Sequence, residues 1–188
     1  MGFTLVAMTG CGGSDEGTGG TSDTGEPGQA QYKATDFAIV IPSEWETLEA
    51  ADFTSQVPGE ARVAFRSNFK NESFTANLNI GQKKIEETVS SSDFAKSNLA
   101  TVKKNLLAFR LIATQKVTIP VGEDEEVEGI LNQFEGKRVA TDPIVEFKQI
   151  SVVYNGIAYT VTGAFLANED ESIVKQLDQM LDSFSLTP

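Results

Sequence analysis

The chain has 188 residues and is acidic, because 27 Asp and Glu outnumber 15 Lys and Arg to give a net charge of −12. Neutralising a nucleic-acid backbone requires clustered Lys and Arg, whereas the basic residues here are single or paired, so we expect no nucleic-acid partner. The chain has no His and only one Cys. This composition excludes Ser-His and Cys-His nucleophiles, thiolate metal sites and the most common zinc ligand.

Residues 1–10 end in Met8-Thr9-Gly10 before Cys11, a pattern that resembles the lipobox of a bacterial lipoprotein. The match is partial, because the apolar stretch before it is short and the first basic residue is Lys33. Residues 1–10 are therefore either part of a lipoprotein signal that starts upstream or an accidental match. We expect the former, with Cys11 as the lipidation site, rather than an isolated thiol in a tail.

Residues 11–31 are predicted to be a flexible tether. Eight of the 16 glycines fall between positions 10 and 28, and this stretch has no aromatic residue, so it cannot bury enough apolar surface to offset its ordering entropy. Residues 32–188 hold all the Tyr, the only Trp and all but one Phe, which predicts one well-cored domain. No apolar run approaches the roughly 20 residues that a transmembrane helix needs.

The first half of the domain is predicted to begin with strands. Residues 36–42 alternate apolar side chains and end at Pro42, and Ser43-Glu44-Trp45 follows as a turn. Residues 61–66 and 73–80 form a further pair, in which the second strand alternates apolar and polar positions without error. Apolar spacings of three and four residues then predict a helix over residues 92–109, with Ser92 as its cap.

The second half is predicted to be a series of strands closed by a helix. Residues 114–121 and 127–138 read as strands joined by an acidic crossing, with a bulge or a close backbone approach at Gly129. Asn155-Gly156 predicts a type I′ hairpin over residues 150–161 that pairs Tyr154 with Ile157 and Val152 with Tyr159. A helix over residues 171–184 follows, capped by Asp170.

This order predicts an α+β fold, an antiparallel β-sheet flanked by helices as an α/β/α sandwich. The strand that ends in Pro42-Ser43-Glu44-Trp45, the helix in mid-chain, the late strand pair and the last helix ending in Ser183-Phe184 resemble the PsbP/Mog1/DcrB superfamily. The resemblance covers about residues 32–187. It implies a non-enzymatic accessory role at a membrane complex, of which the oxygen-evolving photosystem is one example, and it carries over no functional residue.

Carboxylates are the remaining candidates for chemistry. Glu123, Asp124, Glu126 and Glu128 could bind Ca²⁺ through their oxygens, although the ligand order of an EF-hand is missing. The alternative is a solvated loop that discourages strand association. Asn168-Glu169-Asp170-Glu171 can likewise be read as Ca²⁺-binding, but acids also belong at a helix N-terminus, which is the stronger reading. Trp45 is either a ligand platform or a packing residue whose N–H donates to a backbone carbonyl.

We therefore expect a lipid-anchored, non-catalytic, extra-cytoplasmic binding or accessory domain that uses no cofactor. Its partners would be the membrane, through the lipid anchor, and a membrane-associated protein, and the chain itself would be a monomer. The alternatives are a small-molecule or Ca²⁺ binding protein and, less favoured, a hydrolase built on two carboxylates. The sequence does not choose between a sheet edge and a loop end as the recognition surface.

Overall fold

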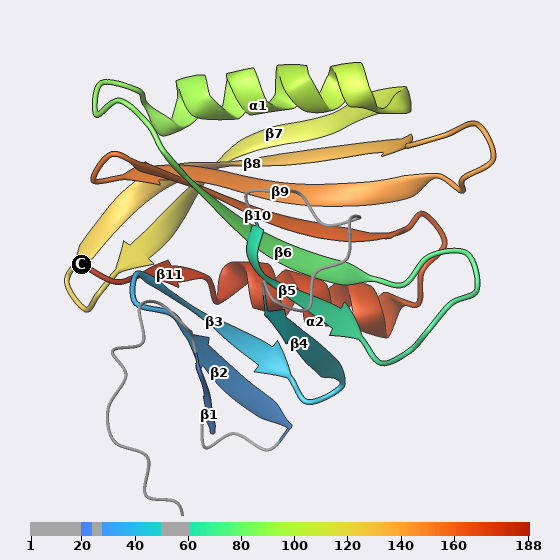
Figure 1. Cartoon of the computed structure of the whole chain (residues 1–188), viewed down its shortest axis with the longest axis horizontal. Coiled ribbons are helices and arrows are strands. Elements are labelled where there is room, and N and C mark those ends of the chain that lie inside the picture. Colours follow the sequence, from blue (N-terminus) through green and yellow to red (C-terminus); the bar gives the residue numbers. More distant parts are fainter. Residues whose placement is uncertain (1–19, 24–27, 50–60) are drawn as a thin grey trace, which may run out of the picture.

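The computed structural model describes residues 20–23, 28–49 and 61–188, so Cys11 lies outside the described residues. Strands hold 55% of the described residues and helices hold 18%. The strands form one sheet with the order β1-β2-β3-β11-β7-β8-β9-β10-β6-β5-β4 (Figure 1). The elements are β1 (Gly20–Asp23), β2 (Gln29–Lys33), β3 (Phe37–Pro42), β4 (Trp45–Glu49), β5 (Ala61–Ser67), β6 (Asn77–Lys84), α1 (Ser91–Asn105), β7 (Leu107–Val121), β8 (Glu125–Lys137), β9 (Val145–Tyr154), β10 (Ile157–Leu166), α2 (Glu171–Asp182) and β11 (Ser185–Leu186).

The sheet curls into a half-barrel. β3 and β4 are joined by the two-residue turn Ser43-Glu44, yet β3 stands third from one end of the strand order and β4 stands at the other end. A flat sheet would separate them by seven strands, so the short turn requires the sheet to fold round on itself. The rings of Tyr32 on β2 and Phe65 on β5 accordingly meet edge to face, with centroids 5.5 Å apart.

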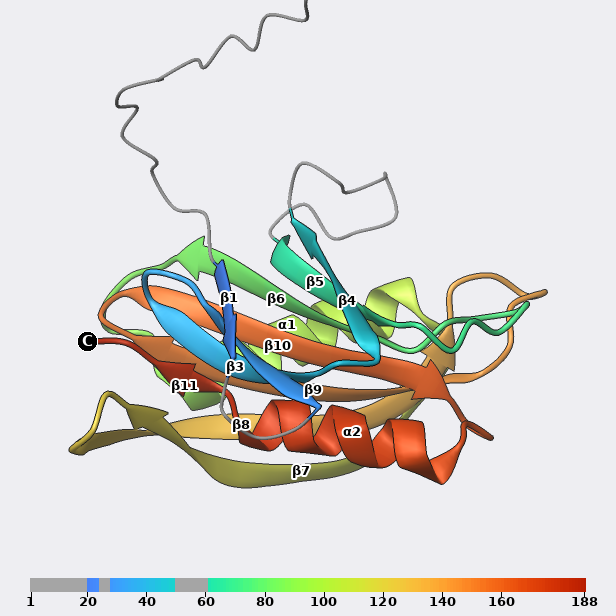
Figure 2. The same ribbon diagram turned by 90° about the horizontal axis from the view of Figure 1, so that it is seen from below.

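The two helices lie on opposite faces of this curled sheet. Lys148 and Gln149 are neighbours on β9, so their side chains point to opposite faces. Lys148 forms a 2.5 Å ion pair with Asp178 on α2, whereas Gln149 accepts a hydrogen bond from Asn98 on α1. Figure 2 shows α2 across the open side of the half-barrel, and Figure 1 shows α1 on the outer face.

The hydrophobic core lies between α2 and the concave face of the sheet. Helix α2 buries Ile173, Leu177, Met180 and Leu181 in this core. It approaches β10 at Gly163, where a Cβ atom would lie only 2.4 Å from Leu177 Cδ2. The core therefore depends on the absence of a side chain at position 163.

The expectation of an α/β/α sandwich is wrong. The protein is mostly β, and its sheet forms the walls around α2 instead of a flat middle layer between two helical layers. On the outer face, α1 buries only Ala95 completely, so that helix is not a full covering layer. The strand and helix pattern along the chain does not report this curl, because the curl depends on which distant strands pair.

Several local predictions are confirmed. The hairpin between β9 and β10 pairs Tyr154 with Ile157 and Val152 with Tyr159, as expected. Asn155 and Gly156 have φ angles of 49° and 72°, the positive values that a type I′ turn requires. Asp170 caps α2 by accepting a 2.8 Å hydrogen bond from the Ser172 N–H.

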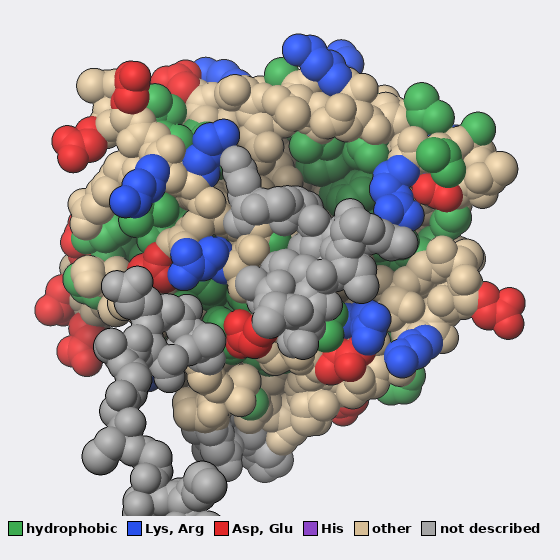
Figure 3. Space-filling view, viewed as in Figure 1, with side chains coloured by type: hydrophobic (Ala, Val, Ile, Leu, Met, Phe, Trp, Pro, Cys, Tyr) green, Lys and Arg blue, Asp and Glu red, His purple; other side chains and the backbone are tan. Residues whose placement is uncertain are grey.

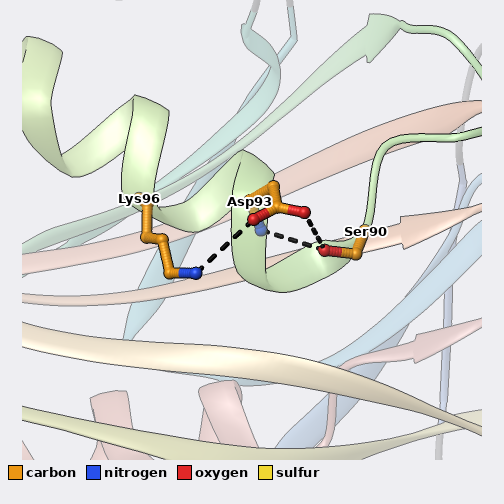
Figure 4. Close-up of polar contacts among 3 residues, drawn as sticks. All are labelled: Ser90, Asp93 and Lys96. Atoms are coloured by element: carbon orange, nitrogen blue, oxygen red, sulfur yellow. Dashed lines mark hydrogen bonds and ion pairs between the residues drawn. The ribbon is translucent and has the colours of Figure 1, made fainter.

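Helix α1 differs from its prediction at both ends. Its cap is Ser90, not Ser92, and the Ser90 Oγ accepts from the Asp93 N–H while donating to the Asp93 carboxylate (Figure 4). Its last residue is Asn105, so the apolar spacing that predicted a helix through Phe109 crosses into β7. The β-sheet partner β8 overrides that spacing, because twelve residue pairs join β7 to β8.

Four strands were not predicted, namely β1, β2, β4 and β11, and β4 begins at Trp45, which was expected in a turn. β1 and β2 pair with each other, so part of the stretch predicted to be flexible lies in strands among the described residues. β11 is only two residues long and pairs with β3 and, through Leu186 and Val121, with β7. These strands lack the alternating apolar pattern on which the prediction relied, and pairing with neighbouring strands forms them.

Candidate functional site

The predicted acidic cluster lies at the tip of the β7–β8 hairpin. Glu123 and Asp124 are in the turn, whereas Glu125, Glu126 and Glu128 are on β8. Successive carboxylates on a strand point to opposite faces. Glu125 accepts a hydrogen bond from the Tyr154 hydroxyl on one face, and Glu128 forms a 2.7 Å ion pair with Lys116.

These carboxylates do not converge on one point. Within residues 20–23, 28–49 and 61–188, no three His, Cys, Asp or Glu side chains are grouped as a metal site would require. The acids at positions 168–171 begin α2, where Asp170 is the cap. Hydrogen bonds from the Ser172 hydroxyl and N–H hold the pKa of Asp170 below its usual value. The reading of these residues as a helix N-terminus is confirmed.

Trp45 is a packing residue. Its side chain is buried, and the indole N–H donates a 2.8 Å hydrogen bond to Oε1 of Gln176 on α2. The acceptor is thus a side chain and not the expected backbone carbonyl. This bond ties the edge strand β4 to the helix that fills the half-barrel.

A second polar cluster lies in the core and was not predicted. The Asp36 carboxylate accepts hydrogen bonds from the Gln82 amide and from the buried Tyr159 hydroxyl, which is 3.2 Å away. Burial, followed by the negative charge of Asp36, raises the pKa of Tyr159 far above its usual value. Tyr159 therefore stays protonated and joins β10 to the chain before β3, which suits a structural role.

The outer face of the sheet carries a polar row beneath α1. Thr114, Asn132, Gln149, Thr162 and Asn79 are cross-strand partners in register on β7, β8, β9, β10 and β6. Asn132 and Gln149 are buried and hydrogen-bonded to their neighbours in the row. Asn98 of α1 donates a hydrogen bond to Gln149 of this row.

Ser151 lies on the same face of β9, two residues beyond Gln149. Its hydroxyl is fully buried and has no hydrogen-bond partner within the described part of the chain. An alternation of polar residues at buried strand positions was the available sequence signal for this row. It was missed because alternating polar positions were taken as solvent-facing.

Two open pockets flank the helices. One, of 520 Å³, lies between the start of α1 and the β9–β10 turn, and it includes Ser90 and Tyr154. The N–H groups nearby are already used, because Asp93 and Phe94 donate to Ser90. The other, of 330 Å³, lies between β3 and the end of α2.

The β7–β8 hairpin stands out as a candidate interaction surface. Four of the five large apolar side chains that are strongly exposed among the described residues are Leu107, Leu111, Ile112 and Val139, which are 42–52% exposed. They lie on the first part of β7 and just after β8, at the end of the hairpin opposite its acidic turn. Figure 3 shows hydrophobic side chains gathered over that end of the molecule.

Basic side chains surround this apolar end. Lys103 and Lys104 are exposed in the last turn of α1, directly before β7. Lys137 is the cross-strand partner of Leu107, and the exposed Arg138 follows it. We call Lys103, Lys104, Lys137 and Arg138 the basic end of the hairpin, and Glu123, Asp124, Glu125 and Glu126 its acidic tip.

The outer side of β7 is an unpaired sheet edge. In the described part of the chain, β8 pairs with one side of β7, and β11 meets its other side only at Val121. Figure 2 shows β7 along the outer margin of the sheet, away from α1. We call the unpaired side of residues 107–120 the β7 edge. Its backbone N–H and C=O groups are available to another strand.

Comparison with known proteins identifies the fold but no close relative. No protein-family model matches the sequence, and no curated protein matches it. The structure is similar to cyanobacterial PsbP (CyanoP) from Synechocystis sp. PCC 6803, with a TM-score of 0.57, 13% identity and coverage of 95% of this chain and 98% of that one. It is also similar to LpqN of Mycobacterium tuberculosis, described as involved in cell envelope biogenesis, with a TM-score of 0.58, 14% identity and 93% of each chain covered.

A third similar structure is the Saccharomyces cerevisiae Ran-binding protein Mog1p, with a TM-score of 0.52, 7% identity and coverage of 91% of this chain and 96% of that one. The chain therefore has a PsbP/Mog1-like fold, as the sequence resemblance implied. At these identities the likeness shows the fold alone. None of the described helices is long and apolar enough to cross a bilayer.

Proposed function

We propose that this protein is a non-catalytic accessory domain that binds a membrane-associated protein and is held at the outer face of a bacterial membrane by acylated Cys11. The observation that carries the proposal is the PsbP/Mog1-like fold, which extends over more than 90% of this chain and of three solved proteins, one described as Ran-binding and one as involved in cell envelope biogenesis. Of the carboxylates that sequence analysis offered as ligands, Asp170 caps α2 and Glu128 forms an ion pair with Lys116.

The proposed mechanism is concentration by tethering. The Gly-rich arm from Cys11 to the start of β1 at Gly20 has about nine residues and a root-mean-square span of about 17 Å, which keeps the folded part close to the bilayer surface. A partner in the same membrane then meets the domain at a raised effective concentration, so a weak contact is sufficient. Two or more acyl chains on Cys11 would make attachment stable, whereas one chain would bind only marginally.

The anchor is tested by changing its only attachment atom. The Cys11→Ser variant, expressed in the native organism, should move from the membrane fraction to the soluble extra-cytoplasmic fraction. Asp15→Asn, a change in the same arm that leaves the thiol intact, is the control and should stay with the membrane. Membrane attachment of Cys11→Ser equal to that of the unchanged protein would contradict the proposal.

Partner binding is tested by crosslinking in living cells. The anchored protein should give a discrete adduct with a membrane-associated protein, and the Cys11→Ser variant should give much less of the same adduct at equal expression, because its local concentration falls. Equal adduct yields from the anchored and unanchored forms would remove the role assigned to the tether. Adducts with itself alone would count against a separate partner.

A further inference from the structure

The β7–β8 hairpin carries opposite charges at its two ends. The acidic tip has four carboxylates in consecutive positions, and the basic end has four cations around Leu107. Residues 107–121 separate the two ends, and a strand of this length spans about 50 Å at about 3.3 Å per residue. This separation is unusual in a chain whose acids outnumber its bases 27 to 15.

We infer that the β7 edge binds a second copy of this chain, with the two β7 strands antiparallel around a two-fold axis. Antiparallel pairing places the acidic tip of each copy beside the basic end of the other, so the same attractive contact forms twice. It also gives hydrogen-bond partners to the unpaired backbone groups of both edges. A dimer departs from the monomer that the sequence analysis expects.

The charges on β7 restrict how the two strands can align. Arg110 and Lys116 are the two cations on this strand. Alignments that set Arg110 opposite Lys116, or either residue opposite its own copy, place like charges together and are unfavourable. Alignments centred on Thr114 or on Gln115 avoid these contacts and keep the strands overlapped.

The alignment centred on Thr114 also satisfies the other features of the edge. It sets Leu107 level with Val121 of the second copy, so the acidic tip of that copy comes level with the end of α1 at Lys103 and Lys104. It sets the exposed Leu111 opposite Val117 of the second copy, which lowers the exposed apolar area. The polar row that ends at Thr114 on β7 would thus continue into the Thr114 row of the second copy.

Two β-bulges limit which part of β7 can pair. The register with β8 shifts between Leu107 and Arg110 and again between Leu111 and Ala113. Bulges twist an edge and discourage strand addition there. From Ala113 to Val121 the register is continuous, and this segment contains both permitted centres. In the alignment centred on Thr114, regular ladder pairing is therefore confined to the stretch around residues 113–115 of both copies, while the charged ends choose the partner and its direction.

Charge reversal tests the inference on the purified full chain. The tip variant carries Glu123→Lys, Asp124→Lys and Glu126→Lys, and the end variant carries Lys103→Glu, Lys104→Glu and Lys137→Glu. By sedimentation, the unchanged chain should be a dimer that weakens with added salt. Each variant alone should dimerise about tenfold more weakly or worse, because like charges now meet. An equal mixture of the two variants should restore the dimer, because each tip again faces an oppositely charged end.

Two further measurements keep the test decisive. Glu44→Lys, Glu72→Lys and Asp182→Lys together change the net charge as the tip variant does, but on exposed residues outside the hairpin. This control should keep the dimer. A spin label at position 114, in a Cys11→Ser background, should report a short distance between copies, whereas a label at position 72 should not.

A chain that stays monomeric at every concentration would overturn the inference. So would a dimer in which the mixture of tip and end variants does not recover, or in which the labels at position 114 are far apart. The dimer is measured on the unacylated chain, so its formation does not depend on the anchor. A failed dimer test therefore leaves the proposed function untested, and a failed anchor test leaves the dimer untouched.

Discussion

Gly163 is the position at which the packing of α2 against β10 is most sensitive to one added methyl group. In Gly163→Ala the new Cβ would lie 2.4 Å from Leu177 Cδ2 and 2.9 Å from Leu177 Cγ, well inside ordinary van der Waals contact. Leu177 is fully buried, so its side chain must adopt another rotamer within the core or the helix and strand must move apart.

The size of the effect follows from two opposing contributions. Overpacking of a core costs about 1–3 kcal/mol. The loss of backbone freedom in the unfolded chain favours Ala over Gly by about 0.4–1 kcal/mol. We expect Gly163→Ala to lower the free energy of unfolding by about 1–2 kcal/mol, which corresponds to a Tm lower by about 2–8 °C for a domain of this size.

The assay is chemical and thermal unfolding followed by circular dichroism, with Gly20→Ala as the matched control. A Cβ at Gly20 meets nothing within 4 Å, so this variant should lose no stability. In a Leu177→Ala background the added methyl at position 163 should cost much less, because its steric partner is gone. A Gly163→Ala protein as stable as the unchanged chain, or a cost that persists without the Leu177 side chain, would refute the packing argument.

Three other changes test local features. Asp170→Ala should lower the free energy of unfolding, and Asp170→Asn should lower it less. Because folding depresses the pKa of Asp170, the stability that its carboxylate contributes is present above the usual pKa of Asp and is lost as the pH falls through the pKa of the folded state. Denaturation at decreasing pH measures this loss. Gly156→Ala forces φ +72° on a side chain and should cost about 1–2 kcal/mol in equilibrium unfolding, whereas Gly20→Ala, at a glycine without a positive φ, should cost little. Tyr159→Phe should reduce the loss of stability at alkaline pH. Because folding raises the pKa of Tyr159, the stability that its protonated hydroxyl contributes is complete below about pH 10 and is lost as the pH rises towards the pKa of the folded state. Parallel curves of stability against alkaline pH for the two proteins would contradict this.

Local chemistry determined the elements that the sequence predicted well. The β9–β10 hairpin follows from Asn155-Gly156, because these two residues tolerate the positive φ of the turn without help from the rest of the chain. Helix α2 follows from its cap and its apolar stripe, both of which lie within twelve residues. The start of α1 was displaced by two residues because Ser90 and Ser92 offer the same hydroxyl.

Long-range pairing determined the elements that the sequence predicted poorly. Leu106 and Phe109 continue the helical spacing of α1, yet the chain leaves the helix at Asn105 because β8 provides a strand partner for residues from Leu107 onward. The half-barrel depends on β3 and β4 standing far apart in the strand order although they are neighbours in the chain. No periodicity in the sequence contains that information.

The candidate surface likewise has one part that the sequence reveals and one part that only the fold assembles. The acidic tip is a run of carboxylates in consecutive positions, so the sequence alone locates it between two strands. The basic end was not predicted, because Lys137 lies more than 30 residues after Lys103 and approaches it only through the pairing of Leu107 with Lys137. In the sequence these cations form two separate pairs, Lys103-Lys104 and Lys137-Arg138, and only the fold joins them into one surface.

The membrane-bound binding role depends above all on the chemical state of Cys11, and mass spectrometry of the N-terminal peptide from native cells measures that state directly. The account predicts a mature chain that begins at Cys11, with a diacylglyceryl group on its sulfur. A mature chain that retains residues before Cys11, with an unmodified thiol, would contradict it.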